Sequence, residues 1–463
     1  MSSSVTVSET KKQSSHWKWW VCGLLLCAST INYMDRMTLA SVSRRMIDEL
    51  HLSKADYGMV EQYFGYAFAC GAILFGLIVD KVSVRWLYPT ILLMWSLMGI
   101  LTGYAGDSGW IGSGLAALWS PLKSITGWSE VLGSLLLCRT MLGFFESGHW
   151  PCALQTTQRL LDPKDWALGN SVLQSGVSIG AIVTPFIVGA MLTDAPGSWR
   201  LPFTVIGLAG MIWVAAWAIT IRGRSLGAPA LPLKQATPKV PWKVSAGRLL
   251  TDHRFWLLAV VVSCINGTWS LYRVWLPLAL QDKAGLAFTE TQTLGRILPL
   301  YYILTDIGCL LAGAATVALH RRGTSVLNSR RWVFTVCSLI VMPAMVLPSL
   351  ARGELAIPGV PALYATMAVL MMTAAGSLGV FPCYYSFTQE LSKEHIGLVT
   401  GLLSFVAWVV PSSLQKPLGA HIDKTGSYDL AFQVGAWPMI FAAVMLWLFW
   451  DLNWLRGKRA VTV

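Results

Sequence analysis

The sequence predicts an all-α membrane protein in which twelve transmembrane helices form two six-helix bundles. The first observation is composition, because the 463-residue chain is 54% hydrophobic and 13% charged, with a mean hydropathy of +0.55. These values lie outside the range of soluble domains. The second is that a window of about 19 residues, enough to cross about 30 Å of hydrocarbon, finds twelve apolar segments. The third is that Lys and Arg residues gather in alternate loops, as membrane orientation requires.

The predicted helices divide six and six around a polar stretch with four prolines, residues 222–253, which we interpret as a cytoplasmic linker. We therefore expect a cytoplasmic tail over 1–16, an N-terminal bundle over 17–221, a C-terminal bundle over 254–451 and a cytoplasmic tail over 452–463. The twelve predicted helices are 17–40, 56–79, 86–105, 131–156, 166–192, 200–221, 254–281, 294–319, 332–351, 362–387, 395–420 and 428–451.

Charge counting sets the expected orientation. With the N-terminus inside, 22 of the 35 Lys and Arg residues fall in cytoplasmic segments, 9 in outer segments and 4 within predicted helices. Both termini are then cytoplasmic, since the number of helices is even. The first apolar segment has no small-residue cleavage site, so we expect it to be retained and not removed as a signal peptide. The nine scattered cysteines predict free thiols. The sequence thus indicates a multi-pass protein of the cell (inner) membrane.

The outer segment 106–130 contains Trp110, Trp119 and Trp128 among Gly and Ser residues. Tryptophans are enriched at membrane interfaces. We expect a short interfacial helix here, and a lid over the outer mouth is the alternative.

Two pairs of opposite charge lie inside predicted helices: Asp35 beside Arg36, and Arg139 seven residues before Glu146. A charge at the bilayer centre costs about 2.5–3.5 kcal/mol on insertion scales, so it persists mainly where it faces a polar cavity or a partner. Seven residues make almost two helical turns, which places Arg139 and Glu146 on the same face. Buried cations can hold an anionic solute and carboxyl groups can carry protons, so the pairs indicate a proton-coupled anion carrier.

A loop motif adds a family resemblance. The run Gly76-Leu-Ile-Val-Asp80-Lys-Val-Ser-Val-Arg85 resembles the cytoplasmic motif G-x-x-x-D-[RK]-x-[GS]-x-[RK] of the major facilitator superfamily. The resemblance implies the major facilitator fold and a gating role for Gly76, Asp80 and Arg85. Asp80 would face a helix N-terminus and a nearby Arg, and these contacts would break when the two halves rock apart. A solvated loop with an ordinary surface ion pair is the alternative.

Further motifs resemble the anion:cation symporter family, and in particular its hexuronate-transporter-like branch. Tyr33-Met-Asp35-Arg36 resembles Y-x-D-R, and Arg139-Thr-Met-Leu-Gly-Phe-Phe-Glu146-Ser-Gly-His-Trp-Pro resembles R-x-x-x-G-x-x-E-[AS]-[AG]-N-[FW]-P. The resemblance implies that Arg36 and Arg139 bind a substrate carboxylate or support its site, and that Asp35 and Glu146 couple transport to protons. Arginine suits this role because its planar fork of donors matches a carboxylate. The alternative is a set of permanent buried ion pairs. In the transport hypothesis, protonation of Glu146 from outside releases Arg139.

Four further residues complete the expected substrate site: Tyr33, Gln174, Tyr272 and Arg273. Gln174 stands where the family commonly has Asn, and Arg273 where the pattern usually has an apolar residue. Two explanations of Arg273 remain open, an added cation that lets both halves clamp an anion, or a pair with Asp306. His149 replaces a common Asn, and we interpret it as a hydrogen-bonded packing residue. Lys416 is expected to reach toward an interface.

The predicted function is import of a small organic anion, such as a hexuronate or aldonate, together with protons by alternating access. An organophosphate/phosphate exchanger that uses Arg36 and Arg273 is the alternative, and a non-transporting membrane sensor is a further one. No enzyme motif, metal-ligand cluster or nucleic-acid feature is found, so we expect a monomeric carrier in the lipid bilayer without a cofactor. H⁺ is the expected coupling ion, and the sequence does not separate it from Na⁺.

Overall fold

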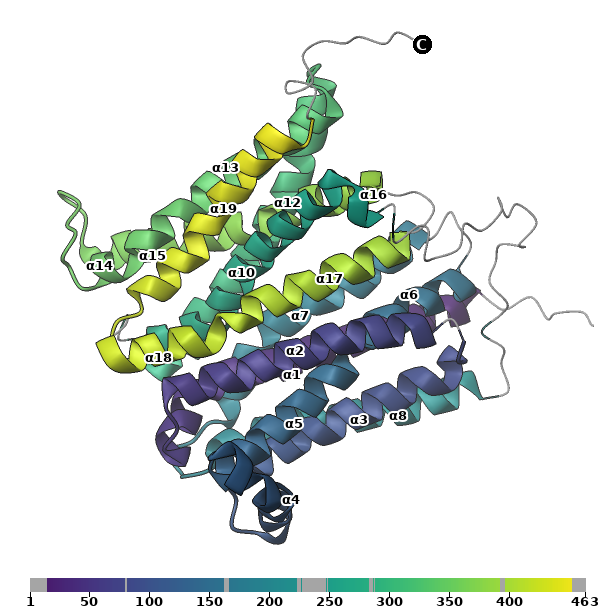
Figure 1. Cartoon of the computed structure of the whole chain (residues 1–463), viewed down its shortest axis with the longest axis vertical. Coiled ribbons are helices and arrows are strands. Elements are labelled where there is room, and N and C mark those ends of the chain that lie inside the picture. Colours follow the sequence, from purple (N-terminus) through teal and green to yellow (C-terminus); the bar gives the residue numbers. More distant parts are fainter. Residues whose placement is uncertain are drawn as a thin grey trace, which may run out of the picture.

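The computed structural model describes residues 15–79, 81–161, 166–222, 249–282, 288–391 and 396–451, together with 226, 247 and 286. Most of these residues are helical (Figure 1). Residues 1–14 of the predicted N-terminal tail, all of the predicted C-terminal tail and most of the predicted linker 222–253 lie outside the described residues.

The helices of the N-terminal half pack in pairs. α1 lies against α7, α2 against α5, and α3 against α8. Ser53 begins α2 with a capping box, in which its hydroxyl accepts from the backbone of Asp56 and the Asp56 carboxylate accepts from the backbone of Ser53. The bounds are α1 (Ser15–Leu50), α2 (Lys54–Ile78), α3 (Val84–Tyr104), α4 (Trp110–Thr126), α5 (Glu130–Glu146), α6 (His149–Leu160), α7 (Trp166–Met191), η2 (Ser198–Arg200) and α8 (Leu201–Ile221).

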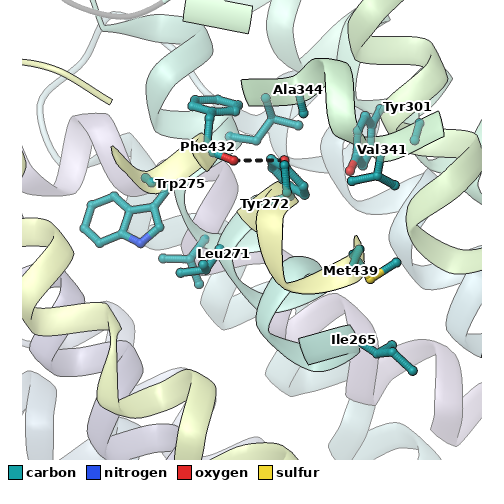
Figure 2. Packing of buried hydrophobic residues seen from close by; sticks show 14 of the residues in the cluster. Ile265, Leu271, Tyr272, Trp275, Tyr301, Val341, Ala344, Phe432 and Met439 are labelled. Atoms are coloured by element: carbon teal, nitrogen blue, oxygen red, sulfur yellow. Dashed lines mark hydrogen bonds between the residues drawn. The ribbon is translucent and has the colours of Figure 1, made fainter. Parts of the chain in front are cut away.

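The C-terminal half packs α10 against α17 and α19, and α12 against α15. Figure 2 shows its core, where Tyr272 of α10 donates to the Phe432 carbonyl of α19 at 3.3 Å among buried apolar side chains. The bounds are α10 (His253–Gln281), α11 (Glu290–Gln292), η4 (Thr293–Ile297), α12 (Leu298–Arg321), α13 (Val326–Val341), η5 (Met342–Val346), α14 (Leu347–Ala351), α15 (Ala362–Gly379), α16 (Phe381–Leu391), α17 (Ile396–Ser413), α18 (Gln415–Thr425) and α19 (Asp429–Phe449).

Within the described part of the chain, ten helices or helix runs are long and apolar enough to cross a membrane. Of the two remaining predicted segments, 17–40 lies within α1, and the described part of 395–420 lies in α17 and α18. The multi-pass, all-helical class predicted from the sequence is therefore confirmed. The number of twelve spans and the cytoplasmic termini stay predictions.

The tryptophan-rich segment 106–130 contains helix α4, as expected. Trp119 stacks on Trp128 with ring centroids 6.0 Å apart and lies against Gly133 of α5. Trp110 at the start of the helix is 85% exposed. The segment thus packs on the N-terminal half through two of its tryptophans and leaves the third free for an interface.

The two halves meet closely along α2, which packs against α17 and α18 (Figure 1). Glycines make this approach possible. A Cβ atom at Gly58 would lie 2.3 Å from the carbonyl oxygen of Gln415, and one at Gly419 would lie 2.2 Å from that of Lys54. The backbones therefore touch where any side chain would force them apart.

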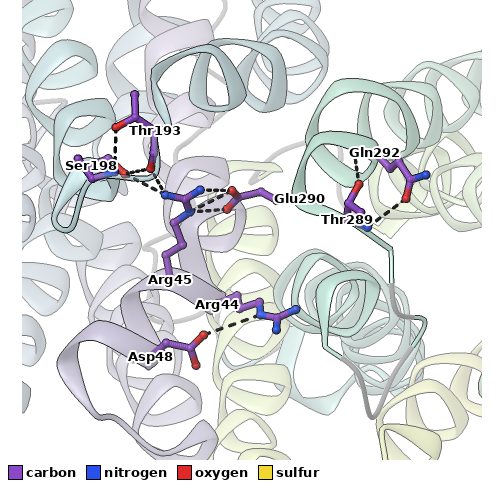
Figure 3. Close-up of polar contacts among 9 residues, drawn as sticks. Arg44, Arg45, Asp48, Thr193, Ser198, Thr289, Glu290 and Gln292 are labelled. Carbon is purple, nitrogen blue, oxygen red and sulfur yellow. Dashed lines mark hydrogen bonds and ion pairs between the residues drawn. The ribbon is translucent and has the colours of Figure 1, made fainter.

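Polar contacts between the halves gather at the same end of the bundle, where α1 and α10 finish, and we call this set the inter-half clamp. Figure 3 shows one of its members, in which Arg45 Nε donates to Glu290 Oε1 at 2.9 Å. Lys54 pairs with Asp282. Asp423 of α18 accepts from the backbone N–H of Lys54 at 2.9 Å, and so binds the N-terminus of α2.

Candidate functional site: a buried cluster of charges between the two halves

Among the described residues, seven Asp, Glu, Lys or Arg side chains are at most 6% exposed, and all but Arg331, which pairs with Asp451, belong to one cluster. The six residues of this cluster come from four helices of both halves, and five of them belong to the N-terminal half. Such charges are costly in a membrane protein and mark functional sites by default. The six are Asp35 and Arg36 of α1, Glu61 of α2, Arg139 and Glu146 of α5, and Arg273 of α10.

The first pair in this cluster joins α1 to α5. Arg36 Nε donates to Glu146 Oε2 at 2.7 Å, and Arg36 Nη2 donates to Asn32 at 3.1 Å. The guanidinium carbon lies 4.7 Å from the ring centroid of Phe68 and 5.3 Å from that of Trp408, which belongs to the other half. These aromatic faces stabilise the cation where it is removed from water.

This pairing differs from the expected one. Arg139 and Glu146 lie on one helix, but the short contact of Glu146 is with Arg36. Among the described residues, the hydrogen bond of Glu146 is thus made to Arg36 and not to Arg139. The physical reason is that α1 brings a guanidinium against the Glu146 carboxylate from a neighbouring helix.

The second pair crosses from one half to the other. Arg273 Nη2 donates to Glu61 Oε2 at 2.7 Å, and Glu61 Oε1 lies 3.9 Å from Arg139 Nη2. The pair of Arg273 with Asp306, one of the two open explanations, is not observed, and Asp306 instead accepts from Ser178 at 2.7 Å. Arg273 instead pairs with Glu61 of the other half, an acid that neither explanation named, and its part in holding an anion stays a prediction.

Arg139 holds the largest set of unused donors in the cluster. Among the described residues, its buried Nε, Nη1 and Nη2 atoms find no hydrogen-bond partner, and neither does the buried Nη1 of Arg273. The Arg139 guanidinium carbon lies 4.9 Å from the ring centroid of Phe64. Unmade hydrogen bonds of a buried charge are expensive, so these donors fit a carboxylate ligand.

Asp35 also has an unused acceptor. Its Oδ2 atom is buried without a hydrogen-bond partner, and its Oδ1 would lie 3.1 Å from a Cβ atom placed on Gly99 of α3. The close approach of α3 at Gly99 leaves room for this carboxyl group. Within the described ranges, no cation lies within 4.0 Å of the Asp35 carboxyl group, whereas Glu146 is paired with Arg36.

The other predicted substrate residues have different surroundings. Tyr33 is buried beside Gly180 of α7. Gln174 is exposed on α7. Tyr272 is buried, but its hydroxyl group is bound to the Phe432 carbonyl, so we do not include it among the ligands proposed below.

Three other sets of residues were singled out in the sequence: His149, Lys416 and the expected gating residues. His149 is fully buried between Ser29 and Tyr88, at 3.0 and 2.9 Å, as expected for a packing residue. Lys416 is exposed. Of the expected gating residues, Asp80 lies outside the described residues, Gly76 has open space around it, and Arg85 stacks on Trp86.

Glu61 was missed by the sequence analysis. The signal was available, because Glu61 is an acidic residue inside the predicted helix 56–79. It stood outside the motifs that carried the family resemblance and had no charged neighbour in sequence to suggest a partner.

Comparisons with known proteins agree with this architecture. The family model described as "Major Facilitator Superfamily" matches residues 25–415. The hexuronate transporter of Escherichia coli (strain K12) is 22% identical over 96% of both chains. The hexuronate transporter of Bacillus subtilis (strain 168) is 23% identical over 95% of both, and the galacturonate transporter of Dickeya chrysanthemi is 19% identical over 70% of this chain and 89% of its own.

Solved structures show the same fold. A bacterial homologue of the human lysosomal transporter Spinster, inward-facing and unoccupied, superposes with a TM-score of 0.69 at 17% identity, over 94% of this chain and 96% of its own. A D-xylose-proton symporter gives 0.66 at 12% identity, over 93% and 97%. The chain belongs to the major facilitator superfamily, and it is a multi-pass inner-membrane transporter and not an enzyme.

Proposed function

We propose that this transporter imports a small organic anion, a sugar acid such as a hexuronate or aldonate, together with protons by alternating access. The observation that carries the proposal is the charge balance of the buried cluster. Its three arginines and three carboxyl groups sum to zero when all six are ionised. An anion that enters such a site adds a buried negative charge, which is costly unless it is compensated.

A proton provides the compensation. Protonation of one carboxyl group restores neutrality when a monoanion binds, so anion and proton are expected to move together. Asp35 and Glu146 are the proposed proton sites, because Asp35 is not fixed in an ion pair and Glu146 loses its charge at the cost of a single contact with Arg36. One proton per monoanion follows from this count.

The substrate carboxylate is proposed to bind Arg139, whose Nε, Nη1 and Nη2 are free of hydrogen-bond partners. Arg36 becomes available as a second ligand of this same carboxylate once Glu146 is protonated, because Arg36 and Arg139 both lie near the ring of Phe64. Tyr33 and Gln174 are kept as candidates for contact with the sugar. The curated relatives support the substrate class, since several of them are named as hexuronate or galacturonate transporters.

Alternating access requires the halves to separate at one end while they close at the other. The inter-half clamp supports this cycle, because Arg45–Glu290, Lys54–Asp282 and the Asp423 contact with α2 all join one half to the other. The charge count of the loops assigns the clamp to the outer face, so this conformation corresponds to a carrier closed on the outside.

The organophosphate/phosphate exchanger is less well supported. It would need Arg36 and Arg273 free for a phosphate, and both are bound to carboxylates at 2.7 Å. It would also have no use for three buried carboxyl groups.

Uptake into proteoliposomes tests the proposal. Labelled glucuronate, galacturonate, galactonate and glycerol phosphate are offered with and without an inward proton gradient, and separately with an inward Na⁺ gradient. We expect accumulation of a sugar acid only with the proton gradient. Accumulation driven by internal phosphate without a proton gradient would contradict symport. Accumulation driven by the Na⁺ gradient would show that the coupling ion is Na⁺ and not H⁺.

A further inference from the structure

We propose that Glu61 determines specificity: its carboxylate takes the position of a second acidic group, so the site selects sugar acids with one carboxylate over diacids. This proposal rests on the proposed function, and it adds that the preferred sugar acids carry one carboxylate. It starts from the finding that the Glu61 carboxylate lies between two arginines, as the carboxylate of a bound substrate would.

The geometry of Glu61 is that of a bound carboxylate. One of its oxygens accepts from Arg273 of the second half at 2.7 Å, and the other lies 3.9 Å from Arg139 of the first half. A carboxylate held between arginines of the two halves is the arrangement that a clamped anionic substrate would require. Glu61 is fixed on α2, so it occupies this position in this conformation while it is ionised.

The remaining donors leave room for a single further carboxylate. Arg36 is neutralised by Glu146 and Arg273 by Glu61, while Arg139 has three buried nitrogen atoms without hydrogen-bond partners. Arg36 and Arg139 both lie near the ring of Phe64, with guanidinium carbons 5.9 and 4.9 Å from its centroid. One acidic group of a substrate therefore finds Arg139 in a compact site between the two pairs.

A second acidic group has no such partner. To reach Arg273 it would have to displace Glu61 or lie beside its negative charge, and like charges in a buried site repel strongly. A diacid would also leave the cluster with an extra negative charge that one proton does not neutralise. Neutralising Glu61 should remove both obstacles at once and free Arg273 for the second group.

The test measures binding of galacturonate, a monoacid, and galactarate, a diacid, to the purified full-length protein in detergent. The quantity compared is the ratio of the two dissociation constants. We expect the wild-type protein to favour galacturonate by about tenfold or more, and Glu61→Gln to shift the ratio toward galactarate by about tenfold or more. Glu61→Asp keeps the charge and should keep the wild-type preference.

A double variant separates the charge effect from a general loosening of the site. Glu61→Gln with Arg273→Gln removes both members of the pair and should return the ratio toward the wild-type value, since the second carboxylate again lacks a cation. An unchanged ratio in Glu61→Gln overturns the proposal, and so does a wild-type preference for galactarate, which can be measured even if the variant does not fold. Failure of the wild-type protein to bind any sugar acid would instead overturn the proposed function itself.

Discussion

The Nε atom of Arg36 donates to Oε2 of Glu146 across 2.7 Å, and this contact ties α1 to α5 in the middle of the buried cluster. The other carboxylate oxygen of Glu146 has no hydrogen-bond partner. The pair is thus held by a single short contact. In the proposed mechanism, protonation of Glu146 breaks that contact and makes Arg36 available to substrate.

The first prediction concerns coupling at this pair. Glu146→Gln mimics the protonated carboxyl group, so the variant should retain exchange of substrate between the two sides but lose accumulation driven by a proton gradient. Counterflow and gradient-driven uptake, measured in the same proteoliposomes, check this. Glu354→Gln, at an exposed ion pair with Arg352, is the matched control and should leave both activities intact. Loss of both activities in Glu146→Gln would favour a purely structural ion pair.

The second prediction concerns the substrate carboxylate. Arg139→Lys keeps the positive charge but removes the planar fork of donors, so affinity for a sugar acid should fall by about tenfold or more. Isothermal titration of the purified protein measures the effect. Arg254→Lys, at a partly exposed pair with Asp451, makes the same chemical change away from the cluster and should bind normally. Equal affinity in Arg139→Lys and the wild-type protein would remove Arg139 from the proposed site.

The third prediction concerns closure of the bundle. Gly419→Ala places a methyl group 2.2 Å from the Lys54 carbonyl oxygen, so α2 and α18 must separate and the inter-half clamp should weaken. Cysteines introduced by Arg45→Cys and Glu290→Cys, in a chain without its native cysteines, should then cross-link less often. Gly401→Ala on α17 has nothing within 4 Å and serves as the control. Unchanged cross-linking in Gly419→Ala would show that closure does not depend on this contact.

The fourth prediction concerns His149. Its ring nitrogens contact Ser29 and Tyr88, and His149→Phe leaves both hydroxyl groups buried without this partner. The free energy of unfolding should fall by about 2 kcal/mol, which thermal unfolding in detergent would register as a lower midpoint. The number of protons moved per substrate should stay the same, because His149 is a packing residue. A changed proton number would assign His149 to the coupling path.

The helical class and four of the six charged residues of the cluster could be predicted from sequence, because both follow from the composition of local segments. Apolar runs of sufficient length form membrane helices wherever they occur. A charge inside such a run signals a buried polar site, which is how Asp35, Arg36, Arg139 and Glu146 were identified. The family motifs then indicated the likeness to anion transporters.

The choice of ion-pair partners could not be predicted in the same way. Glu61 and Arg273 are 212 positions apart in the chain. Their contact exists only because the folded chain brings α2 of one half against α10 of the other. Helical spacing suggested Arg139 as the partner of Glu146, but spacing on one helix says nothing about a guanidinium that arrives from a neighbouring helix.

The sequence by itself determined that this chain is a multi-pass helical carrier with charges buried in its helices, since hydrophobic length and the cost of a charge in lipid are properties of local segments. The tertiary structure alone decided how those charges are paired, which donors stay free, and that Glu61 lies between arginines of both halves. These depend on which helices pack together and how closely. Glycines such as Gly58 and Gly419 allow the two halves to approach closely, but which backbones they meet is decided only by the folded arrangement.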